Sequence, residues 1–178
     1  MKKIIIALTA ILVSLGCLAQ EKNYLATVWG AKSDGVTDNT GSLQRAIDYI
    51  SAHGGGTLSI YVGRYITGAL QLKDNVTLYL GEGAVLVAPT NYYDYKGAPA
   101  LIWSKDAKNI AIKGKGVIEC RRKALEAHIN DQVAKGYLPA GTAVPKPLWL
   151  ENSTARIDET IKVLPDTAKS TRYCSTAE

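Results

Sequence analysis

The sequence predicts an all-β fold, the first coils of a parallel β-helix, with an α-helix that caps the open end. Short, β-rich segments separated by Gly, Asp and Asn turns occupy residues 57–119. A unit of polar turn, strand, glycine turn and strand occurs twice at a nearly fixed interval. A single segment with the apolar period of an amphipathic helix precedes these strands.

The first 19 residues are typical of a bacterial export signal. Two lysines precede an apolar run at 4–15, and the residues at 17–19 fit a cleavage site before Gln20. The run is shorter than the ~20 residues that span a bilayer, so we expect no stable membrane span. The predicted location is secreted or periplasmic. A lipid anchor on Cys17 is the alternative, which Ser14 disfavours because a lipobox prefers Leu three residues before the cysteine.

Composition and charge indicate one ordinary domain. The chain has 178 residues, of which 47% are hydrophobic. Without the signal, 21 basic residues become 19 against 16 acidic ones, so the formal charge falls from +5 to +3. This charge is too small to favour nucleic acid as a partner. Cys120 and Cys174 remain and could pair in an oxidising compartment, but nothing in the sequence places them within ~7 Å of each other.

The elements before the glycine triplet are a strand, a loop and a helix. A mixed run at 23–29 predicts the strand, and GAKSDGVTDNT at 30–40 predicts a turn-rich loop that ends in a helix cap. The helix begins near Thr40 and ends before Gly54. Its apolar face consists of Leu43, Ala46, Ile47 and Ile50. We expect this face to cover the open end of the β-helix, where unpaired backbone would otherwise invite association.

The strands that follow the glycines contain the repeat. They are predicted at 57–62, 64–67, 69–72, 76–80, 84–87, 101–104, 110–113 and 117–119. Asn75 and Asn109 each open an apolar strand that leads to a Gly-x-Gly turn, and the two asparagines are 34 residues apart. A solenoid produces such a repeat because each coil buries its apolar side chains against its neighbours. Chance likeness between β-rich segments is the alternative, since only two copies occur.

The pattern changes after residue 120. Leu125, Ile129 and Val133 predict a helical insertion at 121–136 that follows the cap and first coils at 20–120. Residues 137–178 contain several prolines and a polar stretch without a strand pattern, so this segment is predicted to be an irregular or poorly ordered tail.

Several of these segments together resemble the N-terminal part of glycoside hydrolase family 28. They are the loop GAKSDGVTDNT, the helix LQRAIDYI, the glycine triplet, the block GRYITGALQLKDNVTLYLGEGAVL and the stretch KNIAIKGKGVI, over about 28–118. That family includes polygalacturonases and rhamnogalacturonan hydrolases of the pectate-lyase-like superfamily. The resemblance implies a right-handed parallel β-helix and inverting hydrolysis of O-glycosidic bonds in pectin-type polysaccharide, without a cofactor or metal.

The sequence departs from the family in ways that concern catalysis. Tyr61 stands where the family usually has Pro, and Glu119 and Cys120 stand where it has Asp-Gly. Of the family's later motifs, Asn-x-Asp, Asp-Asp and Gly-His-Gly do not occur, and Arg121-Arg122-Lys123 is the one match to Arg-x-Lys. No catalytic residue is therefore assigned, the substrate-binding residues are unknown, and the chain is predicted to be truncated before the catalytic coils.

Six aspartates are candidates for the carboxyl groups that glycoside hydrolysis requires. Inverting hydrolysis needs two carboxyls ~6.5–9.5 Å apart that converge on one surface. The candidates are Asp34, Asp38, Asp48, Asp74, Asp94 and Asp106, each of which also fits a turn, a cap or a solvated face. Asp34 and Asp38 lack the pattern of a calcium loop, and His53 and His128 lack metal-site spacing, so no metal site is predicted. The aromatic run at 91–95, with Trp103, could contact sugar.

The predicted function is the N-terminal portion of a secreted polygalacturonase-like glycoside hydrolase whose partner is pectin or rhamnogalacturonan. Whether this chain is itself an enzyme stays open, because the family's Asn-x-Asp, Asp-Asp and Gly-His-Gly motifs are absent. The alternative is a non-catalytic carbohydrate-binding or surface β-helix module.

Overall fold

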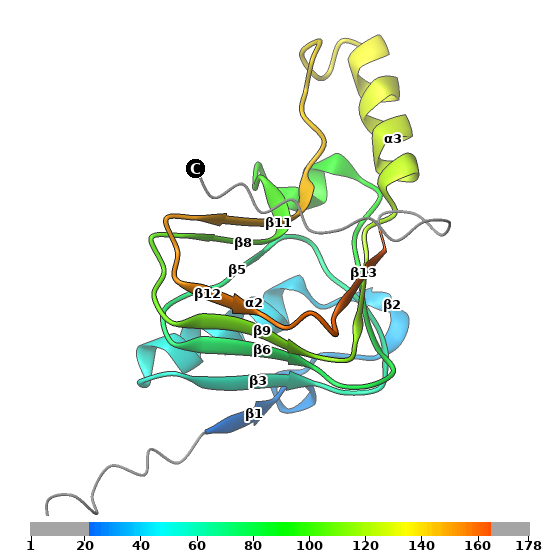
Figure 1. Cartoon of the computed structure of the whole chain (residues 1–178). Helices are drawn as coiled ribbons and strands as arrows, with labels where there is room; N and C mark the ends of the chain where they lie inside the picture. The colour runs from blue at the N-terminus through cyan, green and yellow to red at the C-terminus, as the bar shows by residue number, and fades with distance from the viewer. Residues whose placement is uncertain (1–21, 165–178) are drawn as a thin grey trace, which may run out of the picture.

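The strands of the chain form three parallel sheets in the computed structural model, which describes residues 22–164 (Figure 1). Sheet A contains β1 (Asn23–Leu25), β3 (Gly56–Ile60), β6 (Val76–Leu80), β9 (Ile110–Gly114) and β12 (Ala155–Ile157). Sheet B contains β2 (Asp34–Asp38), β4 (Gly63–Ile66), β7 (Ala84–Val87), β10 (Val117–Glu119) and β13 (Lys162–Leu164). Sheet C contains β5 (Leu70–Gln71), β8 (Ala100–Lys105) and β11 (Lys146–Glu151).

The chain visits the three sheets in turn, and this order makes it a β-helix. From β3 onward it passes through sheet A, sheet B and sheet C before it returns to sheet A, so each revolution adds one strand to each sheet. All paired strands are parallel. The predicted parallel β-helix is confirmed.

The core lies inside the coils and is built from side chains that stack in register. Leu58, Leu78 and Ile112 occupy matching positions of β3, β6 and β9, and each is at most 1% exposed. In β6 buried and half-buried residues alternate, which is the period that sends successive side chains to opposite faces of a strand. Burial of each such side chain contributes about 1.5–3 kcal/mol. Stacking therefore fixes the register between coils.

The predicted repeat marks one corner of successive coils. Asn75 and Asn109 both have a left-handed backbone, with φ of 60° and 53°, and the Nδ2 of Asn109 donates to the Oδ1 of Asn75 at 3.1 Å. Gly55, with φ of 91°, lies against Asn75, where an added Cβ would approach the Asn75 Cβ to 2.5 Å. Any residue larger than glycine at position 55 would therefore clash with Asn75 of the next coil.

Helix α2 (Thr40–Ala52) takes the place in the first coil that sheet C strands take later (Figure 1). All four residues of its predicted apolar face are fully buried. Polar side chains of α2 form hydrogen bonds with backbone groups in β5 and just before it. The backbone N–H of Gln71 donates to the Oε1 of Gln44 at 2.8 Å, and the Nε2 of Gln44 donates to the Gln71 carbonyl at 3.1 Å. The N–H of Gly68 donates to the Oγ1 of Thr40 at 2.6 Å.

The segment before α2 differs from the prediction of a strand at 23–29 and a loop to residue 39. Residues Ala26–Trp29 form the 3-10 helix η1, and Asp34–Asp38 form β2. The cause is Asn39, which is 1% exposed. Its Oδ1 accepts from the N–H of Lys32 at 2.7 Å, and its Nδ2 donates to the carbonyls of Lys32, Thr37 and Ile66. This amide folds the segment back, so that Asp34–Asp38 lies beside β4.

Asp34 organises the turn within this segment. Its carboxylate accepts from the hydroxyl of Thr37 at 2.6 Å and from the N–H groups of Thr37 and Val36 at 2.8 and 2.9 Å. These bonds, with that of the hydroxyl the largest, lower the pKa of Asp34 to about 2. Asp38 accepts from the N–H of Thr40 at 2.9 Å, next to the start of α2. Both residues therefore have structural roles.

The segment after residue 120 contains the helix that was predicted, but not the irregular tail that was predicted from residue 137. Helix α3 spans Arg122–Ala134, and β11, β12 and β13 then add strands to sheets C, A and B. The long connection between β10 and β11 interrupts the 34-residue spacing. The sequence therefore showed no sign of the coil that contains β11, β12 and β13. The corner still repeats, since Asn152 has φ of 47° and its Nδ2 is 3.4 Å from the Oδ1 of Asp106.

Some predictions fall outside the described residues. The signal segment 1–19, the anchor at Cys17 and the end of the tail at 165–178 are among them. Cys120 is buried, but Cys174 lies outside, so their pairing stays a prediction. Within residues 22–164, neither helix is long and apolar enough to cross a membrane.

Substitution Gln44→Ala tests the closure of the edge by α2. Both backbone groups of Gln71 would lose their partner, which costs about 1–3 kcal/mol in the free energy of unfolding. Urea unfolding measures this loss. Arg45→Ala is the matched control, because Arg45 bonds only to Ser42 on its own helix, at 3.3 Å. Equal stability of the two variants would show that the Gln44 amide does not close the edge.

The Thr37→Val variant tests the origin of the low Asp34 pKa. Removal of the hydroxyl should raise the pKa of Asp34 from about 2 towards 3.8, as followed by NMR titration. Because the folded-state pKa is lowered, this turn stabilises the fold above the unfolded pKa, and that contribution disappears as pH falls from about 4 to about 2. Thr142→Val, far along the chain, should leave the titration unchanged. An unshifted Asp34 in Thr37→Val contradicts this assignment.

Candidate functional site

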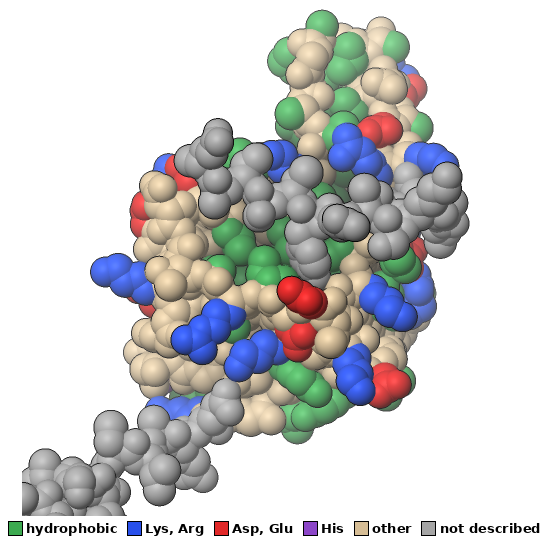
Figure 2. Space-filling view, viewed as in Figure 1, with side chains coloured by type: hydrophobic (Ala, Val, Ile, Leu, Met, Phe, Trp, Pro, Cys, Tyr) green, Lys and Arg blue, Asp and Glu red, His purple; other side chains and the backbone are tan. Residues whose placement is uncertain are grey.

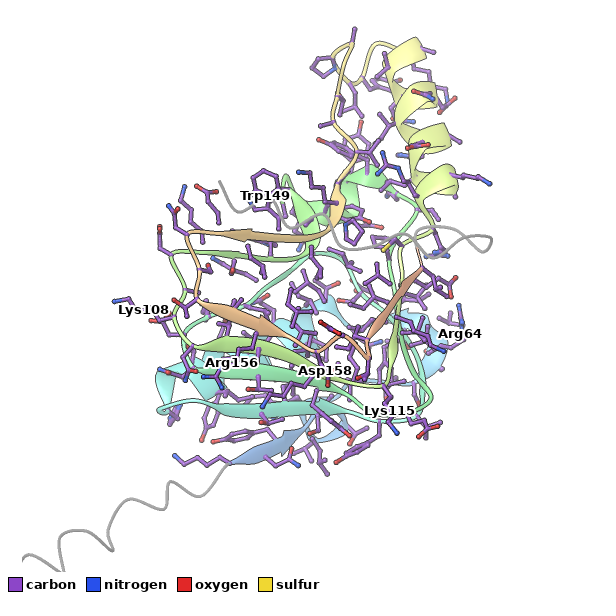
Figure 3. The ribbon with its side chains drawn as sticks, in the orientation of Figure 1. Arg64, Lys108, Lys115, Trp149, Arg156 and Asp158 are labelled. Carbon is purple, nitrogen blue, oxygen red and sulfur yellow. The ribbon has the colours of Figure 1, made fainter. Side chains whose placement is uncertain are left out.

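The outer face of sheet C carries a row of large polar and aromatic side chains. Gln71 of β5 is in register with Trp103 of β8, and Trp103 is in register with Trp149 of β11. Figure 3 shows the Trp149 side chain on the outer side of β11. Two positions along the same strands, the ammonium of Lys105 and the carboxylate of Glu151 are 3.3 Å apart. The three coils therefore present one continuous row of side chains to solvent.

A wall borders this face where the chain passes from sheet B to sheet C. The connection at 88–99 contains the 3-10 helix η2 (Tyr92–Tyr95), and the connection at 120–145 contains α3. Side chains join the two connections. The hydroxyl of Tyr93 lies 3.3 Å from the Oε1 of Gln132, and its ring meets the ring of His128 edge-on at 6.1 Å. The opposite corner has only short turns, at 72–75, 106–109 and 152–154.

A hollow of about 260 Å³ lies between α2, sheet C and this wall. Its lining consists of Gln44, Asp48, Ala69, Gln71, Lys73, Asp94, Tyr95, Lys96, Ala98 and Trp103. Ala69, Tyr95, Ala98 and Trp103 are apolar or aromatic, and the remaining lining residues include two lysines and two aspartates. A second hollow of about 270 Å³ follows at the corner and includes Lys73, Asp74, Lys105 and Asp106. The two share Gln71 and Lys73, so they form one polar groove along sheet C.

The six candidate carboxylates divide between the groove and the segment before α2. Asp48 and Asp94 line the first hollow, Asp74 and Asp106 line the second, and Asp34 and Asp38 lie in the segment before α2. Asp48 is ion-paired with the ammonium of Lys73 at 2.8 Å, and its side chain is 45% exposed. Asp74 accepts from the N–H of Lys108 at 2.7 Å.

The missing element is a buried carboxyl. A general acid in glycoside hydrolysis is protonated because its surroundings disfavour the charge. None of the Asp and Glu residues within 22–164 is buried. The same part of the chain contains no group of three or more His, Cys, Asp or Glu side chains that could hold a metal ion. The groove can thus bind a polar ligand, and none of the carboxyls that line it is buried.

The aromatic residues considered from the sequence divide into two groups. Trp103 lines the groove, as do Asp94 and Tyr95 of the run at 91–95. Tyr95 is nevertheless only 2% exposed and packs in the core, where burial raises its pKa. Tyr93 is exposed but packs against α3.

Sequence reasoning missed most of the lining residues. Gln71, Lys73 and Lys96 line the groove and have no motif of their own, and Trp149, which is in register with Trp103 but is not part of the lining, has none either. One signal was present for Trp149: it stands 46 residues after Trp103, and each tryptophan is followed three residues later by Asp or Asn. His53 stacks on Tyr49 with the ring centroids 3.8 Å apart, and the Nδ1 of His128 accepts from the N–H of Tyr92 at 3.3 Å.

Comparison with known proteins identifies relatives of this chain. No family model matches the chain. An exo-poly-alpha-D-galacturonosidase of Dickeya chrysanthemi is 32% identical over 152 residues, which cover 74% of this chain and 24% of that protein. The chain therefore spans about a quarter of the length of this curated relative.

Solved structures extend the comparison. A protein of Parabacteroides merdae that is provisionally assigned to the glycosyl hydrolases matches with a TM-score of 0.77 and 44% identity, over 80% of this chain and 64% of that one. The family 28 exopolygalacturonase of Yersinia enterocolitica matches in fold, with a TM-score of 0.67 and 23% identity over 82% of this chain and 35% of that one. The chain is thus homologous, over part of their length, to the exo-polygalacturonases of glycoside hydrolase family 28 and to related pectate-lyase-like β-helix proteins.

Proposed function

We propose that this chain binds an acidic, pectin-type polysaccharide along the outer face of sheet C, as part of a polygalacturonase-like glycoside hydrolase. The observation that carries this proposal is the row Gln71, Trp103 and Trp149, which three successive coils place side by side. The exo-poly-alpha-D-galacturonosidase relative supports the choice of polymer.

The spacing of the row suits a polymer that runs along the axis of the β-helix. Neighbouring strands are ~4.8 Å apart, so a sugar chain on this face meets one new side chain per coil. The indoles of Trp103 and Trp149 provide flat apolar faces for sugar rings. Lys96 provides positive charge beside Trp103 for the carboxylate of a uronate residue, whereas Lys73 is ion-paired with Asp48. Gln71 can hydrogen-bond to sugar hydroxyls with its amide.

Binding and hydrolysis are separate in this proposal. Residues 22–164 have no buried carboxyl. Asp48, the groove acid that lies on α2, is ion-paired with Lys73. Hydrolysis would therefore need carboxyls outside these residues. The alternative function, a non-catalytic carbohydrate-binding module, uses the same face and is favoured by the same absence of a buried carboxyl within 22–164.

Substitutions Trp103→Ala and Trp149→Ala test the binding face. Each removes one stacking surface, and we expect each to raise the Kd for polygalacturonate about tenfold, or about 1.4 kcal/mol. Isothermal titration calorimetry measures this change. Tyr137→Ala is the control, because Tyr137 is 71% exposed and is not among the residues that line the groove. If both tryptophan variants bind as tightly as the unchanged chain, sheet C is not the binding face.

The same preparations test the separation of binding from hydrolysis. We expect the 178-residue chain to bind polygalacturonate without releasing reducing ends. Release in proportion to protein concentration would mean that exposed carboxyls of the groove are catalytic, and Asp48→Asn and Asp94→Asn would then identify which of them acts.

A further inference from the structure

The outer face of sheet A is a second solvent-exposed surface with a distinct chemistry. Its exposed or half-buried side chains are Thr57, Thr77, Tyr79, Lys113 and Arg156, whereas Ser59 and Ala111 at the neighbouring positions are buried. Strand register places them in two rows, one of Thr57, Thr77, Ala111 and Arg156, the other of Ser59, Tyr79 and Lys113. This surface belongs to a different sheet from the groove, and it shares no residue with the groove lining.

Three cations on this surface have no ion-pair partner. Lys113 and Arg156 project from β9 and β12, and Lys108 lies in the turn just before β9. None of them comes within 4.0 Å of a carboxylate of the described residues, whereas Arg64 and Lys73 are both ion-paired. Figure 3 shows Arg156 on this face and Lys108 at the corner beside it, and Figure 2 shows basic side chains there with acidic side chains among them.

The three charges are close enough to act together. Arg156 is in register with Ala111, so Lys113 lies two residues along and one strand across, which is about 8 Å between Cα atoms. Lys108 lies three residues before Ala111, in the turn that leads into β9, and is therefore at most about 10 Å from it. The Debye length in ~0.1 M salt is also about 10 Å, so the fields of these charges add for a bound anion.

Acidic residues limit where an anion can lie. Asp158 follows β12, beside Lys113, and it accepts from the N–H and hydroxyl of Thr160 at 2.9 and 2.8 Å and from the N–H of Gly114 at 3.4 Å. Glu159 is adjacent in sequence. Both acids are at the end of β12 that leads to sheet B. An anion is therefore favoured over β9 and β12 on the side of Lys108, away from these acids.

The floor of the surface suits a sugar chain more than a lipid or a nucleic acid. Thr57 and Thr77 are half-buried, small side chains that carry hydroxyls, and Ala111 beside them is buried. The Tyr79 ring lies beside it and meets Tyr61 edge-on at 6.3 Å. A membrane surface would call for an exposed apolar wedge, and nucleic acid for a larger basic surface.

We infer that the outer face of sheet A is a second binding surface for a carboxylated polysaccharide, held by Lys108, Lys113 and Arg156 and separate from the groove on sheet C. The guanidinium of Arg156 can hold a carboxylate with two hydrogen bonds, and the lysines act as point charges on neighbouring sugars. Such a surface would retain a long polymer while another part of it occupies the groove. This inference does not depend on binding at sheet C.

The experiment compares two triple variants of the full chain. K108Q/K113Q/R156Q removes the three cations of sheet A, and R122Q/K123Q/K135Q removes the same charge from α3. Affinity for polygalacturonate and for neutral galactan is measured in 50 and 200 mM NaCl, with circular dichroism as a check of folding. We expect the sheet A variant to raise the Kd for polygalacturonate about fivefold at the lower salt, as three weak surface contacts would. The α3 variant should change it less than twofold.

The outcomes separate this inference from the proposed function. In a chain that also carries Trp103→Ala and Trp149→Ala, residual binding should persist and then disappear with the sheet A substitutions. Equal losses in both triple variants would mean that only net charge matters, and no loss in the sheet A variant would mean that this face does not bind. If binding of a DNA duplex or of phosphatidylserine vesicles is weakened by the three substitutions more strongly than binding of polygalacturonate, the assigned ligand is wrong.

Discussion

The pairing of the first sheet C strand with α2 is the interaction on which the rest of the structure depends. Every strand of a parallel β-helix leaves backbone groups that need the neighbouring coil, and β5 has no strand on its outer side. Helix α2 replaces that strand. Gln44 satisfies both backbone groups of Gln71, Thr40 accepts from Gly68, and the apolar face of the helix covers the end of the core. The coils then stack on a closed base.

Stacking explains why both binding surfaces are rows. Because inward side chains such as Leu58 and Leu78 fix the register of the coils, the outward side chains at matching positions must also line up. Trp103 and Trp149 lie side by side on sheet C for this reason, and Arg156 lies over Ala111 on sheet A for the same reason. A ligand that repeats along its length is the natural partner of such rows, which is consistent with the polysaccharide-acting homologues.

Sequence patterns predicted those parts of the fold that depend on local period. The helix at 40–52 follows from the spacing of its apolar residues, and the coil repeat follows from Asn75 and Asn109. Strand β2 could not be predicted, because it depends on the buried amide of Asn39 and its contact with Ile66, which is distant in sequence. Strands β11, β12 and β13 were not predicted, because the long connection that contains α3 interrupts the repeat. The groove was also hidden, since Gln71, Trp103 and Trp149 become neighbours only through the coils.

Native-state hydrogen exchange at Gln71 and Gly68 tests the closure of sheet C most directly. If α2 replaces a strand, the amides of these two residues exchange as slowly as those of the interior strand β6, because their N–H groups are bonded to Gln44 and Thr40. Exchange as fast as that of the exposed turn at 140–143 would contradict the account, since it would show that the edge of β5 is open to solvent.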